Sequence, residues 1–386
     1  MEQNGGTLSR ENRWAMLALA SMGSFVFLFS VLSVPPVLPS LIRQFDLSYT
    51  VASSLMVWVA LPRLFISLLG GVLVARYGVR AIGSIGLLIV ALGALLSSVT
   101  PSFGLLQAAR FAIGTGGGFV AVATLALVGQ SFSRKQMAMA TGVYTSTMPW
   151  ATITAFNLLG RVEAAYSWHT SFWITFALSA AALPIFWRYA EGRRAEGARM
   201  SLAGFRNVQM WILGLVWATF SMTASAFGYW TKTVFVELRS VEPAYADFLA
   251  TIPIGMGVLA PLYGHVSDRV GRRKPLIVAS LLIGAILFTL VPSLSGIWLL
   301  LLLPVLGIVR TIAPPMIHAL PPEILEPKDV PVGFGVLGAC NNIGWLAGPA
   351  IVGLLMDLYH TIYAPYLAIA MYALVGFALS LLLKTR

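Results

Sequence analysis

The sequence has few charged residues and a single cysteine. Only 10% of its 386 residues are charged and 58% are hydrophobic, whereas a soluble globular protein carries about 25% charged residues. A water-soluble fold of this composition would leave much apolar surface in contact with solvent. This excludes a soluble enzyme, a disordered chain and a nucleic-acid-binding domain. The lone Cys340 excludes an intrachain disulfide and leaves the redox compartment undetermined.

Signs of catalysis, nucleotide binding and metal binding are also missing. We recognise no Ser/His/Asp or paired-carboxylate arrangement, so we expect no enzyme activity. No nucleotide-binding motif occurs and the histidines are scattered, so we expect no cofactor and no metal site. The net charge of +11 does not indicate a nucleic-acid partner, because the basic residues lie in short loops between apolar segments.

Long apolar runs predict an all-α membrane protein with twelve transmembrane helices. A membrane helix needs about 20 apolar residues. The runs cover residues 14–36, 50–73, 80–99, 103–129, 137–159, 168–187, 208–235, 246–265, 275–292, 296–319, 331–356 and 362–383. The longest polar connection follows the sixth run. We therefore expect two pseudo-symmetric six-helix bundles, 1–187 and 208–386, joined by a cytoplasmic linker, 188–207.

The distribution of basic residues predicts the orientation. If the N-terminus is cytoplasmic, the cytoplasmic segments hold 18 of the 25 Lys and Arg residues and the outer loops hold 3. Cytoplasmic loops of membrane proteins carry such an excess. We expect a multi-pass protein of the cytoplasmic (inner) membrane with both termini inside. Lipid is then a partner, and we expect a monomer.

Landmarks in the two halves repeat with a constant offset of 193 residues, which is half of the chain. Duplicated halves of this kind are typical of secondary transporters. The pairs are Gly71/Gly264, Arg76/Arg269, Gly78/Gly271, Arg80/Arg273 and Gly114/Gly307.

The second-half loop carries a recognisable motif, Gly264-x-x-x-Asp268-Arg269-x-Gly271-Arg272-Arg273. It closely resembles the loop signature of the major facilitator superfamily, and Arg110 to Gly116 resembles the second motif of that family. The resemblance covers the whole chain and implies transport by alternating access, with spans one, four, seven and ten lining a central cavity. It also implies a gating role for the six residues named in the loop motif: Gly264, Asp268, Arg269, Gly271, Arg272 and Arg273.

The sequence departs from the family pattern at two places. Ala75 replaces the acid in the first-half loop. Met148-Pro149 in span five replaces the Gly-Pro of the antiporter motif, and Gly344 to Pro349 in span eleven resembles that motif only loosely. The second departure weakens a drug-antiporter interpretation.

Basic residues lie inside the predicted spans, without a carboxylate at their depth. Arg63 and Arg310 lie near the middle of spans two and ten, and Arg110 lies in the outer half of span four. Such residues are costly in a membrane and tend to face protein or water. An anionic substrate would supply the missing counter-charge. Alternatively, each arginine binds backbone carbonyls. Lys232, near the outer end of span seven, is expected to extend to the interface.

Helical spacing places further polar and aromatic residues on shared faces, where they line a cavity or pack against other helices. One such stripe in span ten joins Arg310 to His318, a residue we interpret mainly as a cap. The predicted substrate-binding residues are Arg310, Arg63, Arg110, Tyr144, Trp150, Asn157, Tyr229, Asn341 and Asn342.

We therefore expect a secondary transporter for a small anion, either an organic carboxylate or an inorganic oxoanion. The alternative is an exporter of multiple drugs or neutral compounds, whose pocket would use Trp150, Phe227, Tyr229 and Trp230. A non-transporting membrane receptor is a remote alternative, because no sizeable soluble domain is present.

Overall fold

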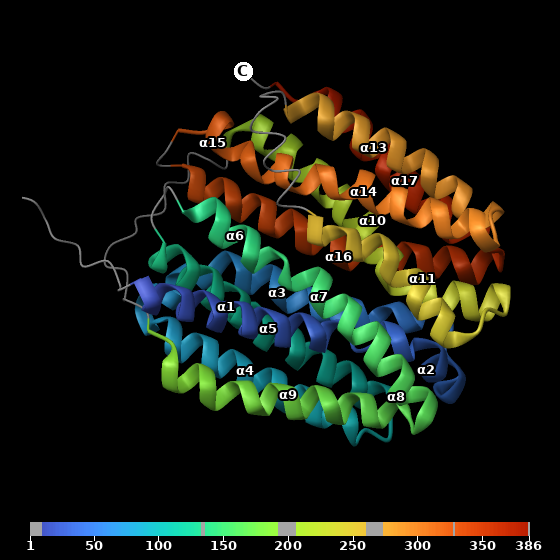
Figure 1. The fold of residues 1–386 in the computed structure, drawn as a ribbon, viewed down its shortest axis with the longest axis horizontal. Coiled ribbons are helices and arrows are strands. Elements are labelled where there is room, and N and C mark those ends of the chain that lie inside the picture. The colour runs from blue at the N-terminus through green and yellow to red at the C-terminus, as the bar shows by residue number, and fades with distance from the viewer. Residues whose placement is uncertain (1–9, 133–135, 192–205, 260–272, 327–328, 385–386) are drawn as a thin grey trace, which may run out of the picture.

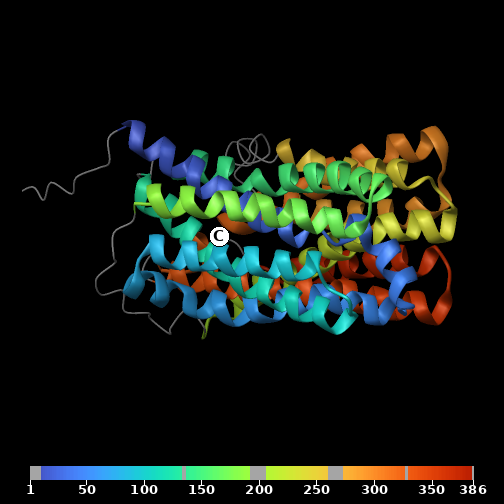
Figure 2. The same ribbon diagram turned by 90° about the horizontal axis from the view of Figure 1, so that it is seen from below.

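The computed structural model describes residues 10–132, 136–191, 206–259, 273–326 and 329–384. These residues form an all-helical bundle without strands. In Figure 1 the helices lie roughly along one direction, with the first half in the lower part of the view and the second half in the upper part. Figure 2 shows the same arrangement from below.

The first half runs from α1 to α9. Its elements are α1 (Arg10–Val31), η1 (Pro35–Val37), α2 (Leu38–Phe45), α3 (Tyr49–Tyr77), α4 (Val79–Ser98), α5 (Phe103–Ser131), α6 (Met137–Thr145), α7 (Thr147–Thr154), the π-helical η2 (Ala155–Leu159), α8 (Gly160–Ala165) and α9 (Trp168–Tyr189).

The second half runs from α10 to α17. Its elements are α10 (Val208–Arg239), α11 (Pro243–Gly255), η4 (Met256–Leu259), α13 (Arg273–Leu290), η5 (Val291–Ser293), α14 (Gly296–Ala319), α15 (Pro321–Ile324), α16 (Val330–Tyr359) and α17 (Tyr363–Leu381).

Ten of the described segments are long and apolar enough to cross a membrane. The predicted fifth span is a broken helix, α6–α7–η2–α8, and the predicted eighth begins with the shorter apolar stretch Pro243–Leu259. The layout is that of twelve membrane helices in two bundles. The first span runs to Phe45 and not to residue 36, because the 3-10 turn at Pro35 continues into α2.

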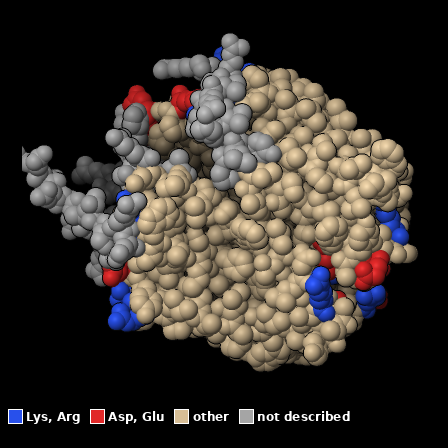
Figure 3. Space-filling model, in the orientation of Figure 1, with Lys and Arg blue, Asp and Glu red and all other residues tan. Residues whose placement is uncertain are grey.

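The bundle has two distinct ends. We call the end where α1 begins and α17 finishes the terminal end, and the opposite end, with α2, α8 and the start of α11, the distal end (Figure 1). The space-filling view shows charged side chains near these ends and a broad uncharged band between them on the visible face (Figure 3). This distribution suits a protein surrounded by lipid.

Side chains at the helix starts explain several boundaries. The Ser48 hydroxyl accepts a hydrogen bond from a backbone N–H in the first turn of α3, and Ser102 does the same for α5. Asn207 and Glu242 cap α10 and α11 in the same way. Each cap pairs backbone N–H groups that have no partner within the helix.

The repeated glycines mark equivalent helix contacts in the two halves. A Cβ on Gly114 of α5 would collide with the carbonyl of Val59 on α3. A Cβ on Gly307 of α14 would come within 2.6 Å of the carbonyl of Pro253 on α11. Both glycines therefore allow two backbones to approach closely, in pairs of helices that correspond under the repeat.

Candidate substrate site

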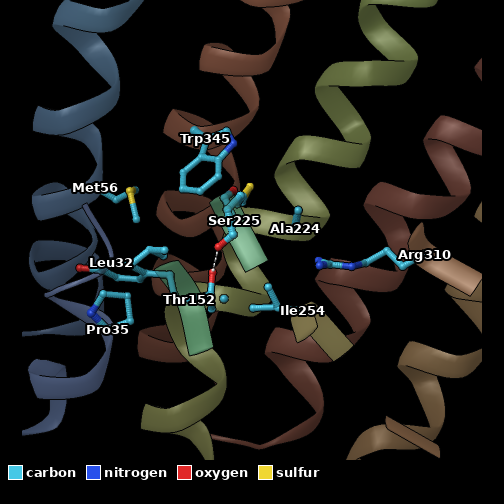
Figure 4. A pocket seen from close by; sticks show the side chains of 12 residues that line it. Leu32, Pro35, Met56, Thr152, Ala224, Ser225, Ile254, Arg310 and Trp345 are labelled. Carbon is cyan, nitrogen blue, oxygen red and sulfur yellow. Dashed lines mark hydrogen bonds between the residues drawn. The ribbon is translucent and has the colours of Figure 1, made fainter. Parts of the chain in front are cut away.

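A pocket lies between the two halves of the molecule (Figure 4). The first half contributes Leu32, which follows α1 directly, and residues from η1, α3 and α7. The second half contributes residues from α10, α11, α14 and α16. Most of the lining is apolar. The lining residues are Leu32, Pro35, Met56, Met148, Thr152, Ala224, Ser225, Gly228, Tyr229, Ile254, Arg310 and Trp345.

Arg310 brings the one positive charge to this lining. It comes from α14, and its side chain points across the pocket towards Ala224 and Ile254 (Figure 4). Its Nη1 atom is buried and has no hydrogen-bond partner among the described residues. A buried guanidinium nitrogen without an acceptor is costly. Among the described residues, no acceptor offsets this cost.

Arg110 on α5 is fully buried and does not line the pocket. Its Nη1 and Nη2 donate hydrogen bonds to the carbonyls of Ser30 and Val31, at 2.9 and 2.8 Å. Its Nε makes a longer contact of 3.5 Å with the carbonyl of Leu55. The arginine thus joins α5 to the end of α1 and to α3.

Arg63 on α3 is half-buried and also lies outside the pocket lining. Its guanidinium lies over the ring of Phe27, 5.0 Å from the ring centre. The Asn342 amide contacts the Arg63 carbonyl at 3.5 Å and the Ser67 hydroxyl at 3.4 Å, which connects α16 to α3. The structure does not bring Arg63 and Arg310 together in one pocket.

Three predicted residues of the fifth and eleventh spans bind other side chains or lie outside the pocket. The Tyr144 hydroxyl lies 2.9 Å from that of Thr124. The Trp150 side chain is 52% exposed and is not among the lining residues. Asn341 accepts a hydrogen bond of 2.8 Å from Ser221, which joins α16 to α10.

The remaining two predicted residues differ in their relation to the pocket. Asn157 lies in the π-helical turn and donates to the carbonyl of Ile153 at 2.9 Å. Tyr229 does line the pocket, and its hydroxyl donates to the carbonyl of Ala52 at 2.6 Å. Of the nine predicted residues, Arg310 and Tyr229 are the two in this lining.

Several lining residues escaped the sequence argument. Met56 and Met148 carry no charge or polar group that would distinguish them from helix-packing residues. Ser225 lies four residues before Tyr229, and Trp345 lies four residues after Asn341, so their helical spacing from predicted residues was an available signal. Thr152 comes from the broken fifth span, where a regular helical wheel misplaces the faces.

The expectation that span four lines the cavity is wrong for this pocket, because α5 contributes none of its lining. Its glycine-rich face is occupied by other helices. A Cβ on Gly117 would collide with Phe27 of α1, and one on Gly116 would collide with the backbone of α4. Close packing therefore places α5 behind the pocket. Spans one, seven and ten do contribute, as expected.

Lys232 does not extend to the membrane interface, so that expectation is also wrong. It is 1% exposed, and its Nζ lies 2.8 Å from Oδ2 of Asp247, which is 2% exposed. The packing of α10 against α11 buries both side chains. Asp247 lies near the start of α11, at the distal end, and is almost completely buried.

Polar contacts between the halves close the distal end. The bond from Tyr229 to Ala52 crosses from α10 to α3. The Asp357 carboxylate of α16 accepts hydrogen bonds from the backbone N–H groups of Tyr49 and Thr50, at 2.8 and 2.7 Å. A side chain of the second half thus caps a helix of the first half. These contacts must separate before the pocket can open distally.

The predicted gating residues Gly264, Asp268, Arg269, Gly271 and Arg272 lie outside the described residues. Arg273 begins α13, where its Nη1 donates to the carbonyl of Ala319 at 2.8 Å and pairs with Glu323. It therefore ties the start of α13 to the end of α14 and to α15 at the terminal end. The described residues contain no group of three or more His, Cys, Asp or Glu that could hold a metal ion.

The molecule consists of two packed helical bundles with a pocket between them, and polar contacts join the bundles at the distal end. This architecture is typical of secondary transporters. The model of the Major Facilitator Superfamily matches residues 20–254 and 240–386. The chain belongs to this superfamily and is a multi-pass membrane protein.

Two kinds of resistance protein are similar to this chain in sequence. The multidrug resistance protein Stp of Mycobacterium tuberculosis is 24% identical over 89% of this chain and 76% of that protein. The class G tetracycline resistance protein of Vibrio anguillarum is 33% identical over 36% of each chain.

Two solved structures share the fold. A bacterial homologue of the lysosomal transporter Spinster, in an inward-facing conformation, has a TM-score of 0.77 with 14% identity, over 97% of this chain and 96% of that one. The human organic anion transporter MFSD10 has a TM-score of 0.73 with 14% identity, over 97% of this chain and all of that one.

Proposed function

We propose that this transporter moves an organic anion across the membrane by alternating access. The observation that carries the proposal is Arg310, whose guanidinium enters the pocket with a buried and unpaired nitrogen. A guanidinium can bind both oxygens of a carboxylate. An anion bound there would supply the acceptor and the counter-charge together.

The rest of the lining favours an organic carboxylate over an inorganic oxoanion. The side chains of Met56, Met148, Ile254 and Trp345 surround the pocket with apolar surface. Binding sites for small organic molecules typically combine such a lining with a few polar groups that fix orientation. An inorganic oxoanion would need donors around its whole surface, whereas the polar side chains of this lining are Arg310, Thr152, Ser225 and a Tyr229 whose hydroxyl already donates to Ala52.

Export of multiple drugs or neutral compounds is the second candidate. The same apolar lining supports it, because a neutral compound needs little more than apolar and aromatic surface. The names of Stp and of the tetracycline resistance proteins also favour it. It leaves the unpaired nitrogen of Arg310 unexplained.

The orientation and the gate complete the proposal. The excess of basic residues in alternate loops supports cytoplasmic termini, so that the distal end faces outwards. We further propose that Asp268 and the neighbouring arginines of the loop motif control closure at the terminal end. We also propose that the protein is a monomer and that membrane lipid surrounds it.

The proposal is tested by thermal unfolding of the purified protein with three matched compounds. These are an aromatic carboxylate, its methyl ester and a quaternary ammonium analogue of the same size. A ligand at about 100 times its Kd stabilises the folded protein by about 2.7 kcal/mol. We expect a rise in Tm with the carboxylate alone. A larger rise with the ester or with the cation would contradict the proposal and favour the second candidate.

A further inference from the structure

A second cavity lies within the second half of the molecule, apart from the pocket between the halves. Helices α10, α13, α14 and α17 all contribute to its lining. Among the lining residues are Phe220, Gly284, Phe288 and Ala373. We call this space the inner cavity. The proposed function does not use it.

Gly284 of α13 gives independent evidence that the inner cavity is hollow. The glycine is buried, and yet a Cβ added to it would meet no atom within 4 Å. Every other described glycine with such open space is at least partly exposed. Protein interiors are closely packed, and an unfilled cavity lowers stability. The hollow is small and suits a group of a few carbon atoms.

The inner cavity offers few polar contacts to a ligand. The Ser280 hydroxyl donates to the carbonyl of Ile277 at 3.0 Å, within α13. The Thr223 hydroxyl does the same within α10, to the carbonyl of Thr219 at 2.9 Å. Neither hydroxyl proton is therefore available, and the rest of the described lining, apart from Arg310, is apolar. Such a cavity accepts apolar groups in preference to water.

Arg310 connects the inner cavity to the substrate pocket. It is the one described residue that lines both spaces. On α10 the adjacent residues Thr223 and Ala224 line the inner cavity and the substrate pocket, respectively. A carboxylate held by the guanidinium of Arg310 therefore lies where two apolar spaces meet.

We propose that the inner cavity is a subsite for a short alkyl group next to the carboxylate of the substrate. The larger apolar part of the substrate, such as a ring, occupies the pocket between the halves. Because both spaces meet at Arg310, both apolar groups are attached to the carbon atom beside the carboxylate. The substrate class is thus a 2-substituted organic carboxylate. This inference rests on the proposed function.

The inference is tested by calorimetric titration of the purified protein with phenylacetate and with each enantiomer of 2-phenylbutyrate. One enantiomer directs its ethyl group towards the inner cavity, and the other directs it elsewhere. Burial of one CH₂ group raises affinity about fourfold. We expect one enantiomer to bind on the order of tenfold more tightly than phenylacetate, and the other to gain little. The enantiomers are equally hydrophobic, so partition into detergent does not produce this difference.

Gly284→Val fills the inner cavity with a side chain of the protein. This variant should bind both enantiomers no more tightly than phenylacetate. Gly284→Ala adds one methyl group where no atom lies within 4 Å, so it keeps the test valid if Gly284→Val does not fold. It should reduce the preference for one enantiomer. Gly129→Val is the matched control, because Gly129 is an exposed glycine of α5 with equally open space, and it should keep the full preference.

The primary amides of the same acids separate this inference from the proposed function. If the amides bind as tightly as the acids and depend on Gly284 in the same way, the anion assignment fails and the inner cavity stands as a subsite. The inference is overturned if neither series shows a preference between enantiomers. It is also overturned if Gly284→Val, or Gly284→Ala where valine prevents folding, retains the full preference, or if Gly129→Val loses it. Tighter binding of the acids than of the amides would then still support the proposed function.

Discussion

Arg110 offers a test of whether a buried arginine of this transporter supports the fold or contacts substrate. Its Nη2 donates a hydrogen bond of 2.8 Å to the carbonyl of Val31, the residue that ends α1. Four residues later stands Pro35, which has no N–H and cannot complete the helical ladder. The Ser30 carbonyl has a second donor, the Ser33 hydroxyl at 2.8 Å.

The expected loss of stability follows from these contacts. Arg110→Met approximately fills the volume and removes the donors, so the Val31 carbonyl is left buried and unpaired. We expect the free energy of unfolding to fall by about 1–3 kcal/mol, the cost of one such group. Arg110→Ala should cost more, because it adds a cavity. Arg110→Lys should fall between the unmodified protein and Arg110→Met, since an ammonium still donates.

The assay is unfolding of the purified variants in detergent, together with anion binding by the folded protein. We expect reduced stability and unchanged affinity for the carboxylate. If Arg110→Met unfolds like the unmodified chain but loses affinity for the anion, the guanidinium serves the ligand, and the contacts with α1 are incidental.

Three further predictions concern other parts of the chain. Gly114→Ala and Gly307→Ala should each lower the free energy of unfolding by about 1–3 kcal/mol in a melting assay, because a backbone carbonyl blocks the new methyl group. Gly284→Ala is the control and should be neutral or stabilising, since no atom lies within 4 Å of the new methyl group. Backbone N–H groups of α11 hold the pKa of Glu242 below its usual value of 4.5. The ionised carboxylate should therefore stabilise the folded protein above pH 4.5, and this stabilisation should disappear as the pH falls through the lowered pKa. Glu242→Gln should remove this part of the pH dependence, and an unchanged profile would contradict the capping role. Arg63→Ala should weaken anion binding less than Arg310→Ala, because its guanidinium lies over a phenylalanine ring outside the pocket; equal losses would place both arginines on one substrate.

The fold was largely predictable from the sequence because lipid imposes simple rules on length and polarity. Apolar runs of about 20 residues and a constant repeat offset sufficed to predict twelve spans in two bundles. The equivalent contacts of Gly114 and Gly307 give that offset a structural basis. The broken fifth span was not anticipated, because its π-helical turn has no distinctive composition.

The site was less predictable, because a sequence shows which groups are charged but not which partners they meet. Arg63, Arg110 and Arg310 looked alike as arginines within apolar spans. The structure gives Arg110 three carbonyl contacts, places Arg63 over a ring, and leaves Arg310 with an unpaired nitrogen in a pocket. Lys232 and Asp247 are 15 residues apart on different helices, so helical spacing could not reveal their pairing.

The most direct test of the central claim is the affinity of Arg310 variants for an aromatic carboxylate, measured by calorimetry on samples whose Tm is checked. Arg310→Ala should lose about 2–5 kcal/mol of binding free energy, as when one partner of a buried charge pair is removed. Arg310→Lys should recover part of this loss, because it keeps the charge without the planar fork. Arg43→Ala, on the exposed face of α2, is the control and should bind normally. Normal carboxylate affinity in well-folded Arg310→Ala would contradict the assignment of an organic anion and favour export of neutral compounds.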